Sequence, residues 1–186
     1  MGLMSALKSR FFSPEICRVA KSGNVASIVE CIAHTQLVVV AADLGNSVPL
    51  DADEQSVISM IHAATRKKRF DGDIHKYEID GKAFLPVFTD RSTAELFCGA
   101  YCDLIGCIHA FRLFAIPGPY IRNWIADDDV IVVNPQSNNE VEFHHDHSQA
   151  IRDRLPGVDD YNEARFLSLA LPMAGISQTI EFRPET

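Results

Sequence analysis

Residues 144–147 place three histidines and an aspartate in consecutive positions. Imidazole nitrogens and carboxylate oxygens are the groups with which proteins bind zinc and other transition metals, so this run is a candidate metal site. Neighbouring residues of a strand point to opposite faces, and a strand at residues 141–143 would direct His144 and His145 apart. Asp146 with Gln149 three residues later matches a capping pair at a helix start. We expect a structural role for the run, and the alternative is a metal-binding protein or metal-dependent hydrolase that uses His144, His145 and His147.

Three of the five cysteines lie close together in the sequence, at Cys98, Cys102 and Cys107. Four-residue spacing places the first two on one helix face, but it is neither a CxxC redox motif nor a zinc knuckle. Small thiols of this kind are usually buried. An odd number of cysteines without tight spacing also argues against a disulfide framework and favours reduced thiols.

Motifs typical of enzymes are missing from the sequence. It has neither a GxGxxG nor a GxxxxGK phosphate loop and no serine elbow. His62 and His109 stand alone. Three consecutive carboxylates at residues 127–129 point in different directions, unlike the alternating ligands of a calcium loop, and favour a solvated turn. We therefore expect no catalytic residue and no cofactor.

A polar loop is the remaining candidate. Residues 134–139, with the sequence NPQSNN, follow an expected central strand at 130–133. In open α/β sheets, ligands and partners meet the carboxyl ends of the strands, and the PGPY segment at 117–120 is expected at the same edge. An uncharged, asparagine-rich loop suits hydrogen-bonded recognition of a protein surface, although Asn-Pro is also ordinary turn chemistry. The predicted binding surface consists of Asn134, Gln136, Asn138, Asn139 and Tyr120.

The charge of the chain limits its partners. A net charge of −8 argues against nonspecific binding to nucleic acid or an anionic membrane, because both require a positive surface. The basic run at residues 66–69 stands where a helix should end, and cations there complement the helix dipole. The longest apolar run, residues 37–42, is far shorter than the ~20 residues of a membrane span. The first 12 residues lack the order of a secretory signal, so we expect a cytoplasmic protein.

Hydrophobic periodicity predicts a mixed α/β (α+β) fold with a central mixed sheet flanked by helices. Helices are expected from residue 14, at 25–32 after Gly23 and Asn24, and at 51–64 behind a capping pair of Asp51 and Glu54. Apolar, β-branched runs at residues 37–42, 108–116 and 130–133 favour strands, the last of them buried on both faces.

Residues 77–90 carry strong local signals. Asp80-Gly81 between two β-rich runs predicts a hairpin, and Pro86 requires an irregular or edge position on its second strand. Thr89 or Asp90 is expected to cap the next helix. A short helix after residue 119, a strand at 141–143 and a helix from residue 146 to about residue 155 follow. The inner stripe of the capped helix is expected to consist of Phe97, Ala100, Tyr101 and Leu104.

The expected organisation is one domain with small additions. Residues 1–24 form a helical extension, residues 25–155 the α/β domain, and residues 156–186 a C-terminal hairpin packed on the same domain. The hairpin strands are expected at 164–171 and 176–182. Its open strand edge could pair with a second copy, so a homodimer is an alternative.

Four segments in this order resemble the SseB N-terminal domain family, the bacterial enhanced serine sensitivity proteins and their relatives. They are the helix and strand at 25–42, the turn and strand DGKAFLPVFTD at 80–90, VIVVNP at 130–135, and VEF at 141–143 leading into a helix. The family carries "LPVFTS" and "LVLNPGS" in the second and third segments, so Gln136 stands where glycine is usual. A longer charged insert at 51–76 is a second departure. The resemblance covers residues 25–155 and implies a mixed α/β domain with no established enzymatic activity, cofactor or catalytic residue.

We therefore predict a non-enzymatic, bacterial, cytoplasmic SseB-like domain that binds or regulates a protein partner. Its acidic surface would speed association with a basic partner and make that association depend on salt. A toxin-neutralising, immunity-like role and a role in metabolic regulation both fit this description.

Overall fold

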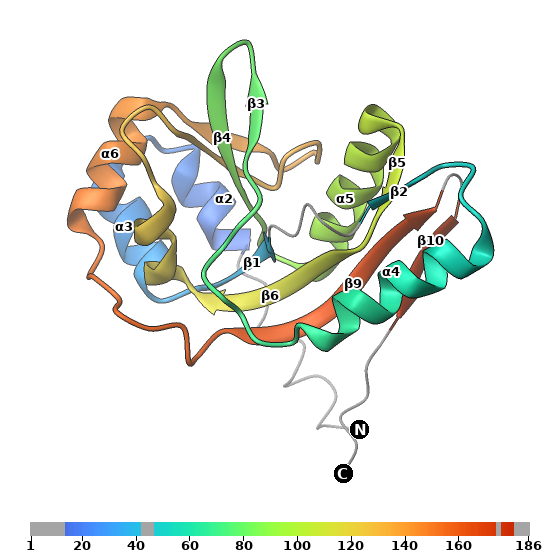
Figure 1. Cartoon of the computed structure of the whole chain (residues 1–186). Coiled ribbons are helices and arrows are strands. Elements are labelled where there is room, and N and C mark those ends of the chain that lie inside the picture. The colour runs from blue at the N-terminus through green and yellow to red at the C-terminus, as the bar shows by residue number, and fades with distance from the viewer. Residues whose placement is uncertain (1–13, 42–46, 174–175, 181–186) are drawn as a thin grey trace, which may run out of the picture.

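A computed structural model describes residues 14–41, 47–173 and 176–180 of the 186-residue chain. They form an α+β fold (Figure 1), which confirms the predicted class. The helices are α2 (Pro14–Ala20), α3 (Val25–Ala33), α4 (Glu54–Arg66), α5 (Arg91–Ile105), the 3₁₀ helix η1 (Gly118–Trp124) and α6 (His145–Arg154). The strands are β1 (Gln36–Ala41), β2 (Ser47–Pro49), β3 (Tyr77–Ile79), β4 (Lys82–Val87), β5 (Cys107–His109), β6 (Phe111–Pro117), β7 (Val130–Val133), β8 (Val141–Phe143), β9 (Arg165–Met173) and β10 (Ile176–Ile180).

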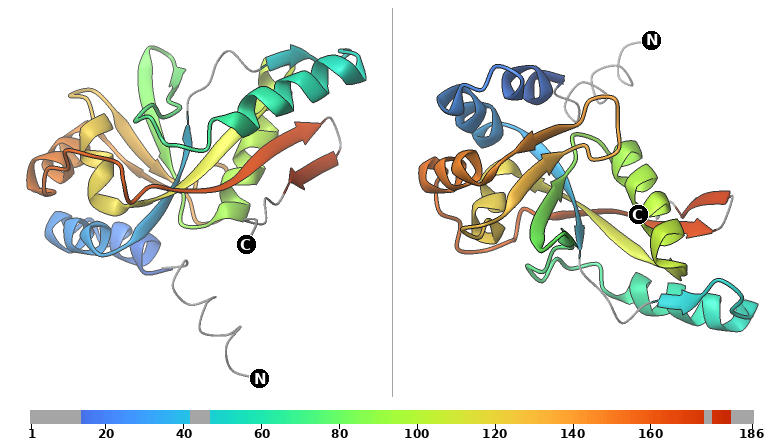
Figure 2. Two further views of the ribbon diagram at one scale, coloured as in Figure 1. Left: turned by 60° about the horizontal axis from the view of Figure 1, so that its bottom comes forward. Right: turned by 90° about the horizontal axis from the view of Figure 1, so that it is seen from above.

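The strands form one antiparallel sheet, one mixed sheet and a small pair. The antiparallel sheet has the order β1-β6-β9-β10, the mixed sheet has the order β3-β4-β7-β8, and β2 pairs with β5. Only β4 and β7 pair in parallel among these strands. The two larger sheets meet where Val38 and Phe88 exchange backbone hydrogen bonds of 2.8 and 2.9 Å. Figure 2 shows the long β6 and β9 crossing the molecule, with helices on both sides of them.

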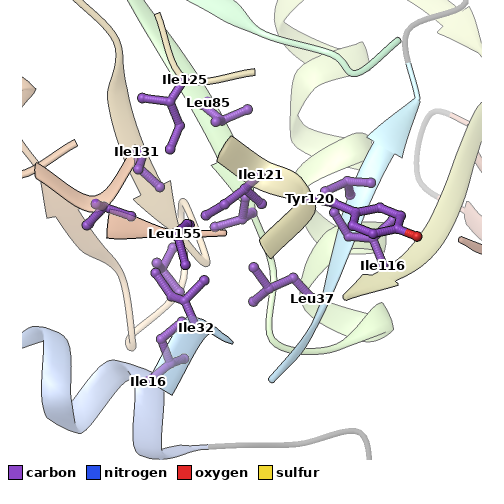
Figure 3. Packing of buried hydrophobic residues seen from close by; sticks show 14 of the residues in the cluster. Ile16, Ile32, Leu37, Leu85, Ile116, Tyr120, Ile121, Ile125, Ile131 and Leu155 are labelled. Carbon is purple, nitrogen blue, oxygen red and sulfur yellow. The ribbon is translucent and has the colours of Figure 1, made fainter. Parts of the chain in front are cut away.

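Strand β1 lies where the two larger sheets meet, and it separates two layers of the core. Its residues alternate between faces, as a strand requires, with Leu37 and Val39 on one side and Val38 and Val40 on the other. The first side packs against α2, α3, η1 and α6 in the largest buried cluster (Figure 3), and the second side packs against α5. A third, smaller cluster joins α4 to β5 and β9.

Several local predictions are confirmed. Asp80 and Gly81 have φ angles of 51° and 76°, the left-handed conformations that a tight hairpin turn requires. Pro86 falls between Phe84, where pairing with β3 ends, and Phe88, where contact with β1 begins. Proline has no backbone N–H. It is tolerated between these two contacts because no neighbouring strand needs a hydrogen bond from that position. The C-terminal hairpin is also present, and β9 joins it to β6.

Other predictions are corrected by tertiary structure. Asp53, not Asp51, caps α4, and its side chain accepts a hydrogen bond from the Ser56 N–H at 2.9 Å. The expected strand at 108–116 is broken at Ala110, because β5 pairs with β2 while β6 pairs with β1 and β9.

The described part of the predicted N-terminal extension packs into the core. Residues 1–13 and the end of the strand predicted at 176–182 lie outside the described residues. In α2, however, Ile16 is fully buried and belongs to the largest cluster. Residues 25–155 are therefore not packed independently of what precedes them.

Candidate functional site

The carboxyl ends of the two parallel strands lie side by side. Phe84 of β4 is in register with Val130 of β7, and Val87 with Val133. Thr89, Asp90 and Asn134 follow these strands directly, so they meet at one edge of the mixed sheet. The structure thus brings the predicted 134–139 loop next to the start of α5.

Asn134 is the centre of this edge, and its position corrects the predicted surface. It is only 3% exposed, and its φ of 52° is left-handed, which asparagine tolerates better than most residues. Its Oδ1 accepts from the Thr89 N–H at 2.8 Å, while its Nδ2 donates to Thr89 Oγ1 at 2.9 Å and to Cys17 Sγ at 3.5 Å. Its amide is used inside the protein and cannot contact a partner.

The next residues of the loop form an ordered turn that presents polar side chains. Gln136 is exposed and has a φ of 63°, a conformation that favours glycine. Its backbone N–H donates to the carboxylate of Glu140. The Ser137 hydroxyl accepts from the Asn139 N–H at 3.1 Å, and the Asn138 and Asn139 side chains are exposed. Three of the five predicted surface residues, Gln136, Asn138 and Asn139, are therefore accessible.

Tyr120 is the second correction to the predicted surface. It is 4% exposed and lies in the main core (Figure 3), where its ring packs edge-on against Tyr161 with centroids 5.5 Å apart. Its hydroxyl accepts a 3.4 Å hydrogen bond from the Glu163 N–H. Tyrosine has an apolar ring and a polar hydroxyl, so the sequence alone was compatible with an exposed position. In the structure, η1 packs this ring into the main core.

Asp90 is a structural carboxylate beside the loop. Its Oδ1 accepts from the Thr93 N–H at 2.8 Å and from the Ser92 hydroxyl at 2.6 Å, which confirms it as the cap of α5. Burial opposes ionisation, but these hydrogen bonds outweigh burial and hold the pKa of Asp90 below its usual value. A carboxylate stabilised in this way is a poor general base near neutral pH.

The histidine run does not assemble a metal site. His144 and His145 are exposed, and His145 Nε2 contacts only its neighbour Asp146, at 2.8 Å from Oδ1. His144 is the residue preceding α6, which begins at His145, so the prediction that Asp146 caps this helix is wrong. Within the described parts of the chain, no group of three histidine, cysteine, aspartate or glutamate side chains could hold a metal ion. The geometry therefore gives no support to the hydrolase alternative.

The cysteines are poor nucleophiles. Burial raises the pKa of Cys98 well above its ordinary value and that of Cys102 to about 11. It also raises the pKa of Cys107, which is only partly exposed. Burial likewise raises the pKa of Cys17, and the hydrogen bond from Asn134 offsets this only in part. Since the thiolate is the reactive form, these side chains act as small apolar groups at neutral pH.

Two of the three carboxylates before β7, Asp127 and Asp128, lie exposed in a turn as expected, but the third does not. Asp129 is buried, and its Oδ2 accepts from Lys76 Nζ at 2.6 Å and from the Ala126 N–H at 2.8 Å. A cavity of about 330 Å³ lies next to this pair, with Lys76 and Trp124 among its lining residues. Asp129 already neutralises the positive charge of Lys76. The pair therefore offers no net charge to a ligand in this cavity.

An exposed apolar stripe on α5 was missed by sequence reasoning. Leu96 and Leu104 are 73% and 80% exposed, whereas Ala94, Cys98 and Cys102 face the core. The prediction that Leu104 belongs to the inner stripe is therefore wrong. The signal was available, because leucines eight residues apart lie on the helix face opposite Cys98.

Comparison of the chain with protein-family models, with curated protein sequences and with solved structures found no match in any of the three. The resemblance to the SseB family therefore stays a prediction. Among the helices of the described residues, each is too short or too polar to cross a membrane.

Proposed function

We propose that this chain is a non-enzymatic, cytoplasmic, SseB-like domain that binds or regulates a protein partner by stoichiometric contact. The contact surface is the exposed part of the 134–139 loop, namely Gln136, Asn138 and Asn139. The absence of a convergent reactive group around the described part of this loop supports binding rather than catalysis, because Asp90, Thr89 and Asn134 are all used in structural hydrogen bonds.

One observation carries the proposal: Gln136 adopts left-handed backbone geometry while its side chain is exposed. Such a conformation costs a residue with a Cβ about 1–2 kcal/mol and is usually avoided by placing glycine there. Backbone strain of this kind clusters at functional sites. A glutamine kept at this cost, within a loop whose backbone is fixed by Glu140 and Ser137, presents a preorganised set of amides to a partner.

Charge supports the nature of the partner. With a net charge of −8, the chain attracts a basic protein more quickly than a neutral one, and added salt would weaken that attraction. An immunity-like role against a basic toxin and a regulatory role toward a basic enzyme are both consistent with this surface.

Site-specific photo-crosslinking tests the proposal. A photoreactive amino acid replaces Asn138 in the full chain, and a matched probe replaces Ala63, an exposed residue of α4 away from the loop. In a native lysate of the source cells, the probe at 138 should form one adduct of defined mass that the probe at 63 does not form. Substituting Gln136 by glycine and Asn139 by alanine, or raising the salt concentration, should reduce the yield.

The same experiment can refute the proposal. Equal adduct patterns from the two probe positions, or no adduct at position 138 in low salt, would show that the loop has no specific partner. An adduct equal in mass to two copies of the chain would instead indicate a homodimer through this loop.

A further inference from the structure

The mixed sheet presents two aromatic rings on one face of its β3–β4 hairpin. Leu85 of β4 and Ile131 of β7 point into the largest core cluster, toward α2, α3 and α6. Because side chains alternate along a strand, Phe84 points to the opposite face, and Tyr77 of β3 shares that face since the two residues are in register. Both rings are half-buried, and the hairpin extends away from the body of the molecule (Figure 1). Part of each residue is therefore accessible to a partner.

The two rings form a stacked platform. Their centroids are 5.2 Å apart, and their planes differ by 8°. Phe97 of α5, a buried residue, contacts the ring of Tyr77 with centroids 5.6 Å apart, so the platform is anchored to the core. The face of an aromatic ring attracts a cation, and a guanidinium group stacks on it particularly well.

A carboxylate lies beside the platform on the same face. Glu142 of β8 is in register with Val132 of β7, and Val132 with Pro86 of β4, which is two residues after Phe84. Registered residues, and residues two apart in a strand, share a face. Glu142 is exposed, as is Glu140 two residues before it.

Both glutamates act on the hydroxyl of Tyr77. Burial first, and then the negative charges of Glu140 and Glu142, raise the pKa of Tyr77 to about 12. Among the described residues, this hydroxyl has no hydrogen-bond partner and Glu142 has no ion-pair partner. The face therefore combines an aromatic platform with negative charge that no cation of the described chain compensates.

The lysines in and next to the hairpin do not neutralise Glu142. Lys76 is used by Asp129, at 2.6 Å from Nζ to Oδ2. Lys82 lies at the turn, four residues before Pro86, which is ~13 Å along the strand. β8 is two strands from β4, a further ~10 Å across the sheet. This separation exceeds the ~8 Å Debye length at physiological ionic strength, so the charge of Glu142 stays available to a partner.

We propose that this aromatic–acidic face, formed by Tyr77, Phe84, Glu140 and Glu142, binds an arginine side chain of a basic protein partner. The guanidinium plane stacks on the accessible part of the platform, and its N–H groups donate to the carboxylates. Arginine is favoured over lysine because its planar, weakly hydrated group stacks and donates at the same time.

The aromatic–acidic face is continuous with the 134–139 loop. The carboxylate of Glu140 accepts from the backbone N–H of Gln136, so one residue both belongs to the face and fixes the loop. A single partner can therefore contact both. The arginine site rests on the proposed function, because it specifies the chemical group by which the same basic partner is recognised.

Titration of the full-length, nitrogen-15-labelled protein with short capped peptides tests the arginine site by NMR. The probe is a peptide of alternating glycine and arginine, and the comparison peptides carry lysine or the uncharged isostere citrulline in place of arginine. The arginine peptide should shift the backbone amide signals of residues 77–84 and 140–142 in a saturable manner. The lysine peptide should bind at least about threefold more weakly, and the citrulline peptide should cause no saturable shift.

Matched variants locate the site. Glu142→Gln removes an exposed charge, and Tyr77→Leu removes the ring but keeps an apolar side chain, so each should weaken binding of the arginine peptide at least about threefold. Glu30→Gln removes an exposed charge on α3 and should leave the affinity unchanged. Amide signals outside the face that match the wild type show that a variant is folded. Because Glu142 is exposed, its variant keeps the test decisive if loss of the Tyr77 ring disturbs the fold.

The outcomes separate this site from the proposed function. The arginine site would be overturned by the absence of a saturable shift with the arginine peptide, by equal binding of the arginine and citrulline peptides, or by equal affinity of the wild type and Glu142→Gln. A saturable shift without a photo-crosslink at position 138 would support the site and refute the contact through the loop. A crosslink at position 138 without a shift would refute the arginine site alone.

Discussion

His75 should make the protein sensitive to acid. The residue lies in the segment between α4 and β3, is 5% exposed, and its backbone N–H donates to the Val40 carbonyl at 2.7 Å. Its ring packs edge-on against Tyr101, with centroids 4.6 Å apart, and its Nε2 is buried without a hydrogen-bond partner in the described structure. Burial first, and then the nearby His109, lower the pKa of His75 from 6.5 to about 4.

The direction of the effect follows from proton binding. Between about pH 6.5 and pH 4 the unfolded chain protonates this imidazole, whereas the folded chain keeps it neutral. The contribution of neutral His75 to the free energy of unfolding is therefore fully present above about pH 6.5, and it is lost as the pH falls toward 4. A shift of 2.5 units at ~1.4 kcal/mol per unit corresponds to about 3 kcal/mol in total, of which about 2 kcal/mol should be lost by pH 4.5.

Urea denaturation of the wild type and of His75→Phe at pH 7 and pH 4.5 measures this contribution. Phenylalanine provides an uncharged ring for the same aromatic cluster, so the variant should lose about 2 kcal/mol less than the wild type on acidification. The His62→Gln variant is the control, since this histidine of α4 is exposed, and its acid sensitivity should match the wild type. If His75→Phe and the wild type lose equal stability, His75 is protonated as easily in the folded protein as in the unfolded one, and the reasoning is wrong.

Three further predictions concern the backbone. Gln136→Gly should raise the free energy of unfolding by up to about 1 kcal/mol in urea, because it relieves left-handed strain, and any decrease in that free energy would contradict it. Gly118→Ala should lower the free energy of unfolding by about 3 kcal/mol, because its Cβ would overlap the Ile32 carbonyl. Gly23→Ala, in open space at a φ of 67°, should lower it by only about 1 kcal/mol. Equal shifts in the thermal unfolding midpoints of the two variants would refute the comparison. Asn134→Ala should cost about 3 kcal/mol by calorimetry, because it leaves a buried N–H unbonded, and a loss below about 1 kcal/mol would mean that the amide bonds are replaceable.

Predictions that depended on neighbouring residues were accurate. The Asp80-Gly81 turn and the Asp90 cap were found from the sequence because their hydrogen bonds lie within four residues. The buried run of β7 was equally clear, since it is apolar at every position and lies between two strands.

Predictions that depended on the three-dimensional arrangement were less accurate. Asp51 and Asp53 are equally good caps by type, and the turn after β2, where the Ala52 N–H donates to the Pro49 carbonyl, selects Asp53. The burial of Asn134 depends on Cys17 and Thr89, which are distant in sequence. Which face of α5 packs on the core depends on where β1 and β6 lie beneath it.

The position of β1 between the two larger sheets bears on how the molecule comes apart. It pairs with β6 from Gln36 to Ala41, and on its other edge it is bonded to Phe88 and His75. Removing this strand would expose both layers of the core at once, so neither half can open while the other stays intact. Backbone amides on the two sides of β1 should therefore exchange with solvent in one cooperative event, and a defect in either layer weakens the whole molecule.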